Sequence, residues 1–286
     1  MKLLTFRRAD SAPEPGVLLP NGDVASLKGA GFPDLLSVIE GGDGARGKIE
    51  EFLANLPLNC IAAATAATVM APIARPSKII CVGLNYRDHA IESNMEIPSV
   101  PTIFNKFNTS VIGPGENIVL PKSSTKPDYE AEFAVIIGKG GRHISTDRWQ
   151  EHVFGYTNLN DVSARDYQMA TTQWLMGKTF DTFAPTGPYI ATADEIENPH
   201  NLDISCSING EVLQNSNTRH LIFRIPELIE YLSRVFTLEP GDIISTGTPA
   251  GVGFARKPPR FLKPGDEVVV SVQGLGELRN PVVAEV

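Results

Sequence analysis

The chain of 286 residues is long enough to bury a large core, and its 42% hydrophobic and 20% charged residues are ordinary for a globular protein. A formal net charge of −8, without a clustered run of Lys and Arg, argues against a nucleic-acid partner, because phosphate binding needs such clusters. The three cysteines, Cys60, Cys81 and Cys206, are too widely spaced for a disulfide framework or a Cys-x-x-Cys zinc site.

The opening residues, MKLLTFRRAD, become charged after four positions and lack the apolar segment of a signal peptide. No stretch of the sequence approaches the roughly 20 apolar residues that a membrane-spanning helix needs. Together with the unpaired cysteines, these features predict a protein of the reducing cytoplasm that does not contact a membrane.

Residues 1–60 predict short strands at 2–6 and 16–20, then helical patterns at 33–40 and 47–56 separated by the glycine cluster GGDGARG. No residue in this part suggests catalysis. The stretch AAATAATVMAPIARPSK is poor in charge and contains two prolines, which indicates a domain boundary. We therefore predict a small N-terminal α/β domain over residues 1–73 and a catalytic domain over residues 74–286.

The second part predicts a mixed α+β fold dominated by strands. Short β-branched and aromatic runs, bounded by turn residues, lie at 78–84, 102–107, 129–138, 153–160, 187–192, 202–213, 242–247 and 267–278. Asn209-Gly210 predicts a two-residue hairpin turn, and the repeated Pro-Gly-Asp at 240–242 and 264–266 predicts two further turns. Helical patterns are fewer and lie at 86–93, 145–153, 163–171 and 225–235.

Two glutamates interrupt the apolar run YEAEFAVIIGK. Glu130 and Glu132 are two positions apart, so in a strand they point to the same side, about 7 Å from each other. Such like charges repel when buried, so they either lie in solvent at a strand end or share a cation. Asp161, at the end of the next strand-like run, adds a third carboxylate and favours the cation. Oxygen donors alone favour Mg²⁺ or Mn²⁺ over Zn²⁺.

Five segments carry a resemblance to a known family. YEAEFAVIIGK, GYTNLNDVSARDYQ, GKTFDTFAPTGPYI, INGEVLQNSNT and STGTPAGVG, in this order, resemble the fumarylacetoacetate hydrolase family over residues 76–286. The resemblance implies that Glu130, Glu132 and Asp161 hold the metal, and that the fold is the family's β-roll with few helices. It marks Lys178 as a substrate-site lysine and implies a homodimer formed through the β-rich domain.

The resemblance also implies that His89 and Glu92, on a mobile segment, form the general base. The two residues lie three positions apart, on one face of a helical turn, where the carboxylate can orient the imidazole and raise its basicity. The remaining histidines are predicted to be surface or core residues, and neither a Gly-x-Ser-x-Gly nor a His-Glu-x-x-His motif is present. Lys178 lacks the glycine spacing of a phosphate loop, which argues against a nucleotide site.

Three further residues are predicted to contact substrate. Arg165 lies one helical turn after Asp161 and suits either an anionic substrate or an ion pair with Asp161. Gln168 follows on the same predicted helix. Thr248 lies in the glycine-rich segment STGTPAGVGF, whose backbone N–H groups suit an anion, although a tight loop without a ligand has the same composition.

These residues predict a metal-dependent enzyme that acts on a small anionic 2-oxo acid. We favour hydrolysis of the carbon–carbon bond of an acylpyruvate, with His89 and Glu92 activating water and the pyruvate enolate stabilised by the metal and Lys178. Decarboxylation of oxaloacetate and isomerisation or tautomerisation of 2-oxo acids pass through the same enolate and are the alternatives. A non-catalytic metal or oxo-acid binder is an alternative of another class, which the His89–Glu92 pair disfavours.

Overall fold

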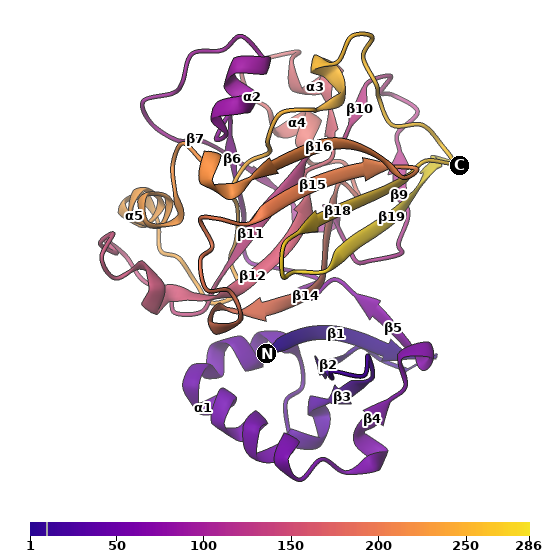
Figure 1. Cartoon of the computed structure of the whole chain (residues 1–286), viewed down its shortest axis with the longest axis vertical. Coiled ribbons are helices and arrows are strands. Elements are labelled where there is room, and N and C mark those ends of the chain that lie inside the picture. The colour runs from indigo at the N-terminus through magenta and orange to yellow at the C-terminus, as the bar shows by residue number, and fades with distance from the viewer. Residues whose placement is uncertain (10) are drawn as a thin grey trace.

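The computed structural model describes residues 1–9 and 11–286 of the chain. A β-rich body, made from the middle and the C-terminal part of the chain, stands above a smaller N-terminal part (Figure 1). The strand-dominated mixed α+β fold predicted from the sequence is confirmed. None of the helices in the described residues combines the length and hydrophobicity that crossing a membrane requires.

The largest sheet has the strand order β4-β3-β2-β1-β14-β12-β11-β17-β6-β7. Adjacent strands in this order are antiparallel, except that β17 and β6 are parallel. The strands are β1 Lys2–Arg8, β2 Glu14–Leu18, β3 Val24–Ser26, β4 Ile61–Ala62, β6 Ile79–Gly83, β7 Thr102–Lys106, β11 Ala131–Ile137, β12 Val153–Asn160, β14 Ala184–Thr192 and β17 Ile243–Ser245. At its margins β5 Ala67–Met70 pairs with β1, and β8 Val111–Ile112 pairs with β14.

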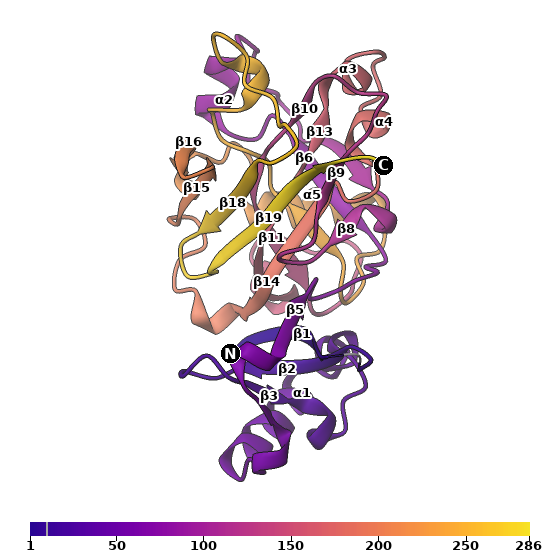
Figure 2. The same cartoon turned by 90° about the vertical axis from the view of Figure 1, so that its right-hand side faces the viewer.

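A second sheet, in the order β16-β15-β18-β19-β9, packs against the strands β11, β12 and β14 of the first (Figure 2). Its strands are β9 Ile118–Leu120, β15 Asp203–Ile208, β16 Glu211–Asn217, β18 Glu267–Val272 and β19 Glu277–Ala284. The predicted hairpin joins β15 to β16, where Asn209 and Gly210 have φ of 53° and 84°. The short strands β10 Pro127–Asp128 and β13 Ser163–Ala164 pair with each other.

The helices are short apart from two. They are α1 Leu35–Ala54, α2 Arg87–Glu92, α3 Arg165–Gln168, α4 Leu175–Lys178 and α5 Ile225–Val235. Single 3-10 turns are η1 Leu27–Ala30, η2 Leu58–Cys60, η3 Ala64–Ala66, η4 Asn108–Ser110, η5 Trp149–His152, η6 Ala193–Glu195, η7 Thr218–His220 and η8 Gly253–Ala255. Within α1 the backbone of Gly42 is not helical, with φ of 49° and ψ of −133°, so two helical segments meet at a kink in the predicted glycine cluster. The helix predicted at 145–153 forms only the turn η5.

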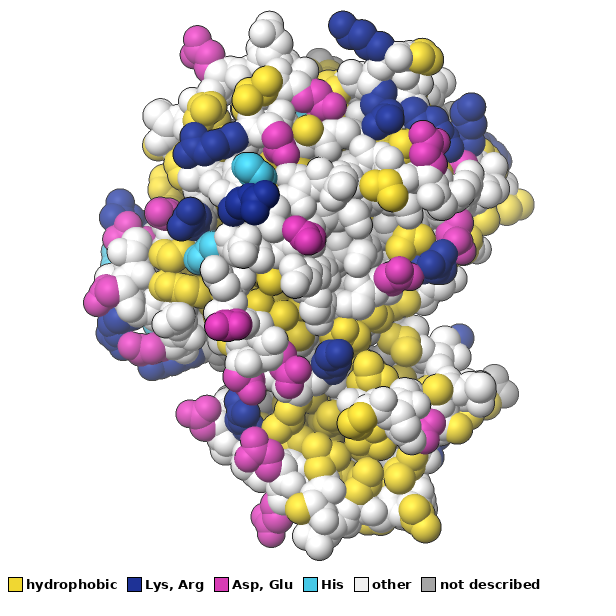
Figure 3. Space-filling model, viewed as in Figure 1, with side chains coloured by type: hydrophobic (Ala, Val, Ile, Leu, Met, Phe, Trp, Pro, Cys, Tyr) yellow, Lys and Arg dark blue, Asp and Glu magenta, His cyan; other side chains and the backbone are white. Residues whose placement is uncertain are grey.

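The N-terminal strands continue the sheet of the body, because Lys2 and Leu3 of β1 pair with Ala191 and Ile190 of β14. The division predicted near residue 73 falls in the connection between β5 and β6. On the face shown in Figure 3, acidic and basic side chains are interspersed, and hydrophobic side chains gather over the N-terminal part.

Strand β11 is buried along its whole length and separates two layers of the core. Phe133, Val135 and Ile137 face the second sheet, while Ala134 and Ile136 face the layer that includes α1. This alternation is the usual period of two along a strand. A strand hydrogen-bonded on both sides, by β12 and β17, and covered on both faces is a rigid support for side chains at its end.

Replacing Phe133 by Ala is expected to lower the free energy of unfolding by about 3–5 kcal/mol, because a buried aromatic ring leaves a cavity. The ring is fully buried and stacks on Tyr156 with the centroids 5.1 Å apart. Urea-induced unfolding followed by circular dichroism measures the change. The matched control is Val212→Ala, whose side chain is 59% exposed and whose loss should change stability by no more than about 0.5 kcal/mol. Equal effects of the two substitutions would contradict this account of the core.

Candidate functional site

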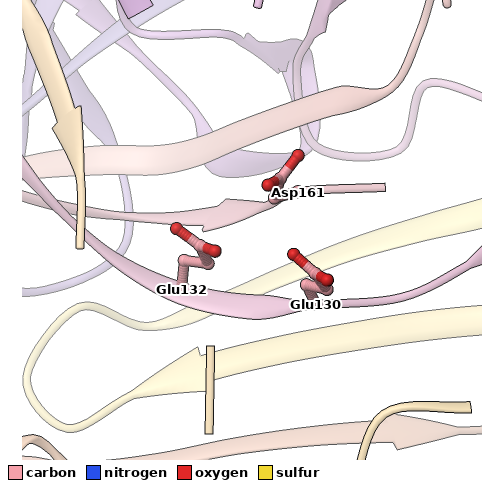
Figure 4. Close-up of side chains that lie close together, drawn as sticks. All are labelled: Glu130, Glu132 and Asp161. Carbon is pink, nitrogen blue, oxygen red and sulfur yellow. The ribbon is translucent and has the colours of Figure 1, made fainter. Parts of the chain in front are cut away.

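The three predicted acids come together at one end of β11 (Figure 4). Glu130 directly precedes the strand, Glu132 lies within it, and Asp161 directly follows β12. The pairing of β11 with β12 sets this arrangement, and the N–H of Asp161 donates to the carbonyl oxygen of Glu130 at 2.9 Å. All three side chains are buried, and one carboxylate oxygen from each lies within 4.8 Å of the others.

Two buried lysines balance part of this negative charge. Nζ of Lys178, at the end of α4, lies 2.6 Å from a carboxylate oxygen of Glu130 and 2.7 Å from one of Asp161. Nζ of Lys106, at the end of β7, lies 2.5 Å from the other oxygen of Asp161 and donates to the carbonyl oxygen of Val162 at 3.0 Å. Lys106 was not predicted from the sequence. The available signal was a lysine at the end of the short strand pattern TIFNK.

Arg165 supplies a third buried cation. Its Nη1 lies 2.6 Å from Glu130 and donates to Gln168 at 2.8 Å, and its Nε donates to Asp128 at 2.8 Å. The ion pair with Asp161 that the helical spacing allowed does not form, because the two lysines take up both oxygens of that carboxylate. Burial opposes the charge of Arg165, but Glu130 and Asp128 outweigh it and raise the pKa of the guanidinium.

The glutamates differ in their surroundings. Burial would raise the pKa of Glu130, but Lys178 and Arg165 outweigh burial and hold that pKa well below its usual range. Burial raises the pKa of Glu132 well above its usual range, and the charges of Asp161 and Glu130 raise it further. The carboxylate of Glu132 therefore needs either a proton or a cation.

Neutral donors contact Glu132 on the side of β17. One of its oxygens accepts hydrogen bonds from the hydroxyl of Ser245 and from the N–H of Gly247 at 2.9 Å. Gly247 has φ of 99°, and a Cβ there would lie 2.9 Å from the carbonyl oxygen of Val82, so only glycine suits this position. Three buried carboxylates with one under-compensated member fit a divalent cation that prefers oxygen ligands.

His89 and Glu92, the residues predicted to form a general base, lie side by side on α2. Nδ1 of His89 lies 3.5 Å from Oε2 of Glu92, and both carboxylate oxygens of Glu92 accept from the N–H of Gly251 at 3.0 Å. Burial would raise the pKa of Glu92, but the contacts with His89 and Gly251 outweigh it and lower that pKa. Glu92 is therefore held as a carboxylate beside a buried imidazole.

A pocket of about 430 Å³ connects these groups. Its lining includes seven of the predicted site residues: His89, Glu130, Glu132, Arg165, Gln168, Lys178 and Thr248. Asp161 and Glu92 lie behind this lining and act on residues that face the pocket. The rest of the wall is largely apolar and consists of Val82, Gly83, Leu84, Met95, Phe104, Met169, Trp174 and Phe254, with Ser93. The hydroxyl of Thr248 accepts from Gln214 at 2.8 Å, which fixes it at the edge of the pocket.

Comparison with known families agrees with this site. The family profile described as "Fumarylacetoacetate (FAA) hydrolase C-terminal" matches residues 78–283. The chain belongs to the fumarylacetoacetate hydrolase family. The match includes both strands that carry the acids, and it confirms the resemblance carried by the sequence segments.

Similar proteins include tautomerases, hydrolases and isomerases. "Oxaloacetate tautomerase Fahd2a, mitochondrial" of Rattus norvegicus is 53% identical over 217 residues, which cover 76% of this chain and 69% of the relative. The Homo sapiens protein "Oxaloacetate tautomerase FAHD2A, mitochondrial" is 51% identical over 218 residues, with the same coverage. A solved structure of maleylpyruvate hydrolase from Sphingobium sp. SYK-6, in complex with manganese(II) and pyruvate, is 31% identical with a TM-score of 0.85, and 100% of each chain is covered.

These findings correct one prediction and refine another. The cytoplasmic prediction is wrong, because the relatives from rat, cattle and human are named mitochondrial. Free cysteines indicate a reducing compartment, and the cytosol is not the only one. The prediction of a divalent metal agrees with the buried carboxylates and with the manganese of the maleylpyruvate hydrolase structure.

The raised pKa of Glu132 predicts a pH dependence of stability in protein stripped of divalent ions. The folded protein holds a proton on Glu132 that the unfolded chain releases near pH 4.3, so this group stabilises the fold less as the pH rises above about 4.3. Glu132→Gln should remove this dependence, since the amide cannot ionise. Chemical unfolding of both proteins from pH 4 to pH 8 in the presence of a chelator measures the difference. If the stability of the wild type and of the Glu132→Gln variant changed equally with pH, Glu132 would not be the source of the pH dependence.

Proposed function

We propose that this protein catalyses the keto–enol tautomerisation of oxaloacetate with a bound divalent cation. The observation that carries the proposal is the pocket itself, where Glu130, Glu132 and Lys178 face the same space as His89, with Asp161 beside the two glutamates. The relatives named oxaloacetate tautomerases support this reaction over the acylpyruvate hydrolysis favoured by the sequence analysis, because their identity of 50–53% exceeds that of the maleylpyruvate hydrolase.

Glu130, Glu132 and Asp161 would hold the cation. When bound, a divalent ion supplies Lewis-acid polarisation of the keto group and binds the neighbouring carboxylate of a 2-oxo acid. We propose Mg²⁺ or Mn²⁺, since both take carboxylate oxygens and leave positions for water or substrate.

His89 is the proposed proton carrier. Tautomerisation moves a proton from C3 of oxaloacetate to the keto oxygen, so a base must reach C3 and a donor must stabilise the oxygen. His89 faces the pocket, and Glu92 can orient its imidazole through the 3.5 Å contact. Burial lowers the pKa of Lys178, but Asp161 and Glu130 outweigh burial and raise it, so the ammonium keeps its proton. Lys178 therefore suits a hydrogen-bond donor to the developing negative oxygen, and His89 suits the base.

Arg165 is the proposed contact for the second carboxylate of oxaloacetate. Its Nη2 is buried and donates to no acceptor in the part of the chain that the structure describes. Arg165 lines the pocket, and a guanidinium there with one unsatisfied nitrogen favours a dianionic ligand. Gln168 and Thr248 lie in the same lining and can orient that carboxylate.

Hydrolysis of a maleylpyruvate-type 2,4-dioxo acid is the second candidate. The structure of a maleylpyruvate hydrolase covers the whole chain at a TM-score of 0.85. The apolar part of the lining, which includes Phe104, Met169 and Trp174, also suits a longer carbon chain than that of oxaloacetate. In that reaction His89 would activate water for attack on C4 instead of moving the C3 proton.

The two candidates are separated by adding enol-oxaloacetate, dissolved in an aprotic solvent, to buffered enzyme. The loss of the enol absorbance should accelerate with Mg²⁺ or Mn²⁺ and return to the spontaneous rate with a chelator. Release of pyruvate from acylpyruvates, maleylpyruvate and oxaloacetate is measured in parallel with a coupled dehydrogenase. Rapid release of pyruvate from a dioxo acid, without acceleration of tautomerisation, would favour the hydrolase and contradict our proposal.

His89→Ala should reduce turnover at least about 100-fold, because general acid–base catalysis contributes roughly that factor or more. Binding of Mn²⁺ should stay nearly unchanged, since His89 does not belong to the carboxylate cluster. Calorimetric titration with Mn²⁺ and the enol assay provide the two measurements. His143→Asn is the matched control: His143 is exposed, and Asn tolerates its φ of 52°. Full turnover by the His89 variant would remove the proposed base.

A further inference from the structure

Asp128 is a fully buried carboxylate outside the proposed metal site. It lies at the end of β10, and its two oxygens accept four hydrogen bonds. Oδ1 accepts from the N–H of Gly253 at 2.7 Å and from the N–H of Tyr129 at 2.9 Å. Oδ2 accepts from Nε of Arg165 at 2.8 Å and from the N–H of Phe254 at 3.0 Å. One side chain therefore fixes both the first residue of α3 and the turn η8.

The two segments that Asp128 joins meet in the pocket. The guanidinium of Arg165 lies over the ring of Phe254, with Cζ 4.6 Å from the centroid, and the same ring lies edge-on to His89 at 6.4 Å. The absence of a side chain at Gly253 lets Asp128 approach the backbone of η8, because a Cβ there would lie 2.4 Å from Oδ1 of Asp128. Both Arg165 and Phe254 line the pocket, while Asp128 does not, so any effect of Asp128 on a ligand passes through them.

The contacts of Arg165 leave one nitrogen for a ligand. Nε is held by Asp128, and Nη1 is held by Glu130 and Gln168, whereas Nη2 has no partner among residues 1–9 and 11–286. Because the guanidinium is planar, fixing two of its nitrogens fixes the direction of the third. The direction of Nη2 is therefore set in part by a carboxylate that the substrate never touches.

We propose that Asp128 is a positioning residue that aims Nη2 of Arg165 at the second carboxylate of a dicarboxylate substrate. The inference rests on the proposed function and adds to it the residue that selects a dianionic over a monoanionic 2-oxo acid. Pyruvate provides the comparison, since it has the 2-oxo acid group of oxaloacetate without the second carboxylate.

Two substitutions test the link. Asp128→Asn keeps the shape, but in either orientation its NH₂ group faces two of the four donors, and the charge that pairs with Arg165 is lost. Arg165→Lys keeps a positive charge and leaves Asp128 in place, but it removes the Nε donor. The wild type, both single variants and the double variant are compared by KM for oxaloacetate tautomerisation and by the inhibition constant of pyruvate, each with Mn²⁺ present.

Asp128→Asn should raise KM for oxaloacetate about tenfold or more, as expected for loss of a hydrogen bond to a charged group, and change the inhibition constant of pyruvate less than about threefold. In the Arg165→Lys background the same substitution should add little, because residues that act through one contact are not additive. An equal loss for both ligands, or the same fold-change in both backgrounds, would show that Asp128 only supports the fold and would overturn the proposal.

Thermal unfolding verifies that each variant is folded. If Asp128→Asn does not fold, Asp128→Glu replaces it, because the longer side chain keeps the charge but displaces the oxygen that holds Nε of Arg165. A rise in KM confined to oxaloacetate supports the proposal, and equal changes for oxaloacetate and pyruvate overturn it. Failure of the proposed function looks different, because the wild type itself would then not accelerate oxaloacetate tautomerisation with any of the divalent ions.

Discussion

The structure depends on the compensation of buried carboxylates at the end of β11. Four lie there, Asp128, Glu130, Glu132 and Asp161, and three cations face them, Lys106, Lys178 and Arg165. The cations contact every carboxylate except that of Glu132, whose partners among residues 1–9 and 11–286 are a hydroxyl and an N–H. Burying such a cluster of charges destabilises the fold by several kcal/mol unless the remaining negative charge, that of Glu132, is also neutralised. A bound divalent ion would neutralise that charge.

The fold places the two halves of the site on supports of different rigidity. The acids are held by β11 and β12, in the middle of the largest sheet, whereas His89 and Glu92 lie on a helix of six residues. The loop that follows β17 joins these halves. Its Gly247 donates to Glu132, and its Gly251 donates to Glu92. Backbone hydrogen bonds from this one loop therefore help to set the position of His89 and Glu92 relative to the three acids.

Local patterns in the sequence predicted the acids and the strands, but not Lys106, Asp128 or the partners of Arg165. The period of two along β11 places Glu130 and Glu132 on one side whatever the rest of the fold does. Lys106 contacts Asp161 across 55 positions of the chain, and Asp128 contacts Gly253 across 125, so no spacing in the sequence reports either contact. The partner of Arg165 was missed for the same reason: helical spacing suggested Asp161, whereas the antiparallel pair β10–β13 brings Asp128 and Glu130 to it.

The choice between tautomerisation and hydrolysis depends on water, and not on the carboxylates that both reactions share. Hydrolysis needs a water molecule held by polar groups beside C4, while tautomerisation needs only a base at C3 and a dry surrounding that strengthens the electrostatic contacts. Two polar groups of the pocket are held as acceptors, Thr248 by Gln214 and Gln168 by Arg165, so each keeps a donor that can bind a substrate carboxylate. The remaining wall of Phe104, Met169, Trp174 and Phe254 offers a water molecule little to bind. Under the proposed function, this distribution favours proton transfer within the substrate.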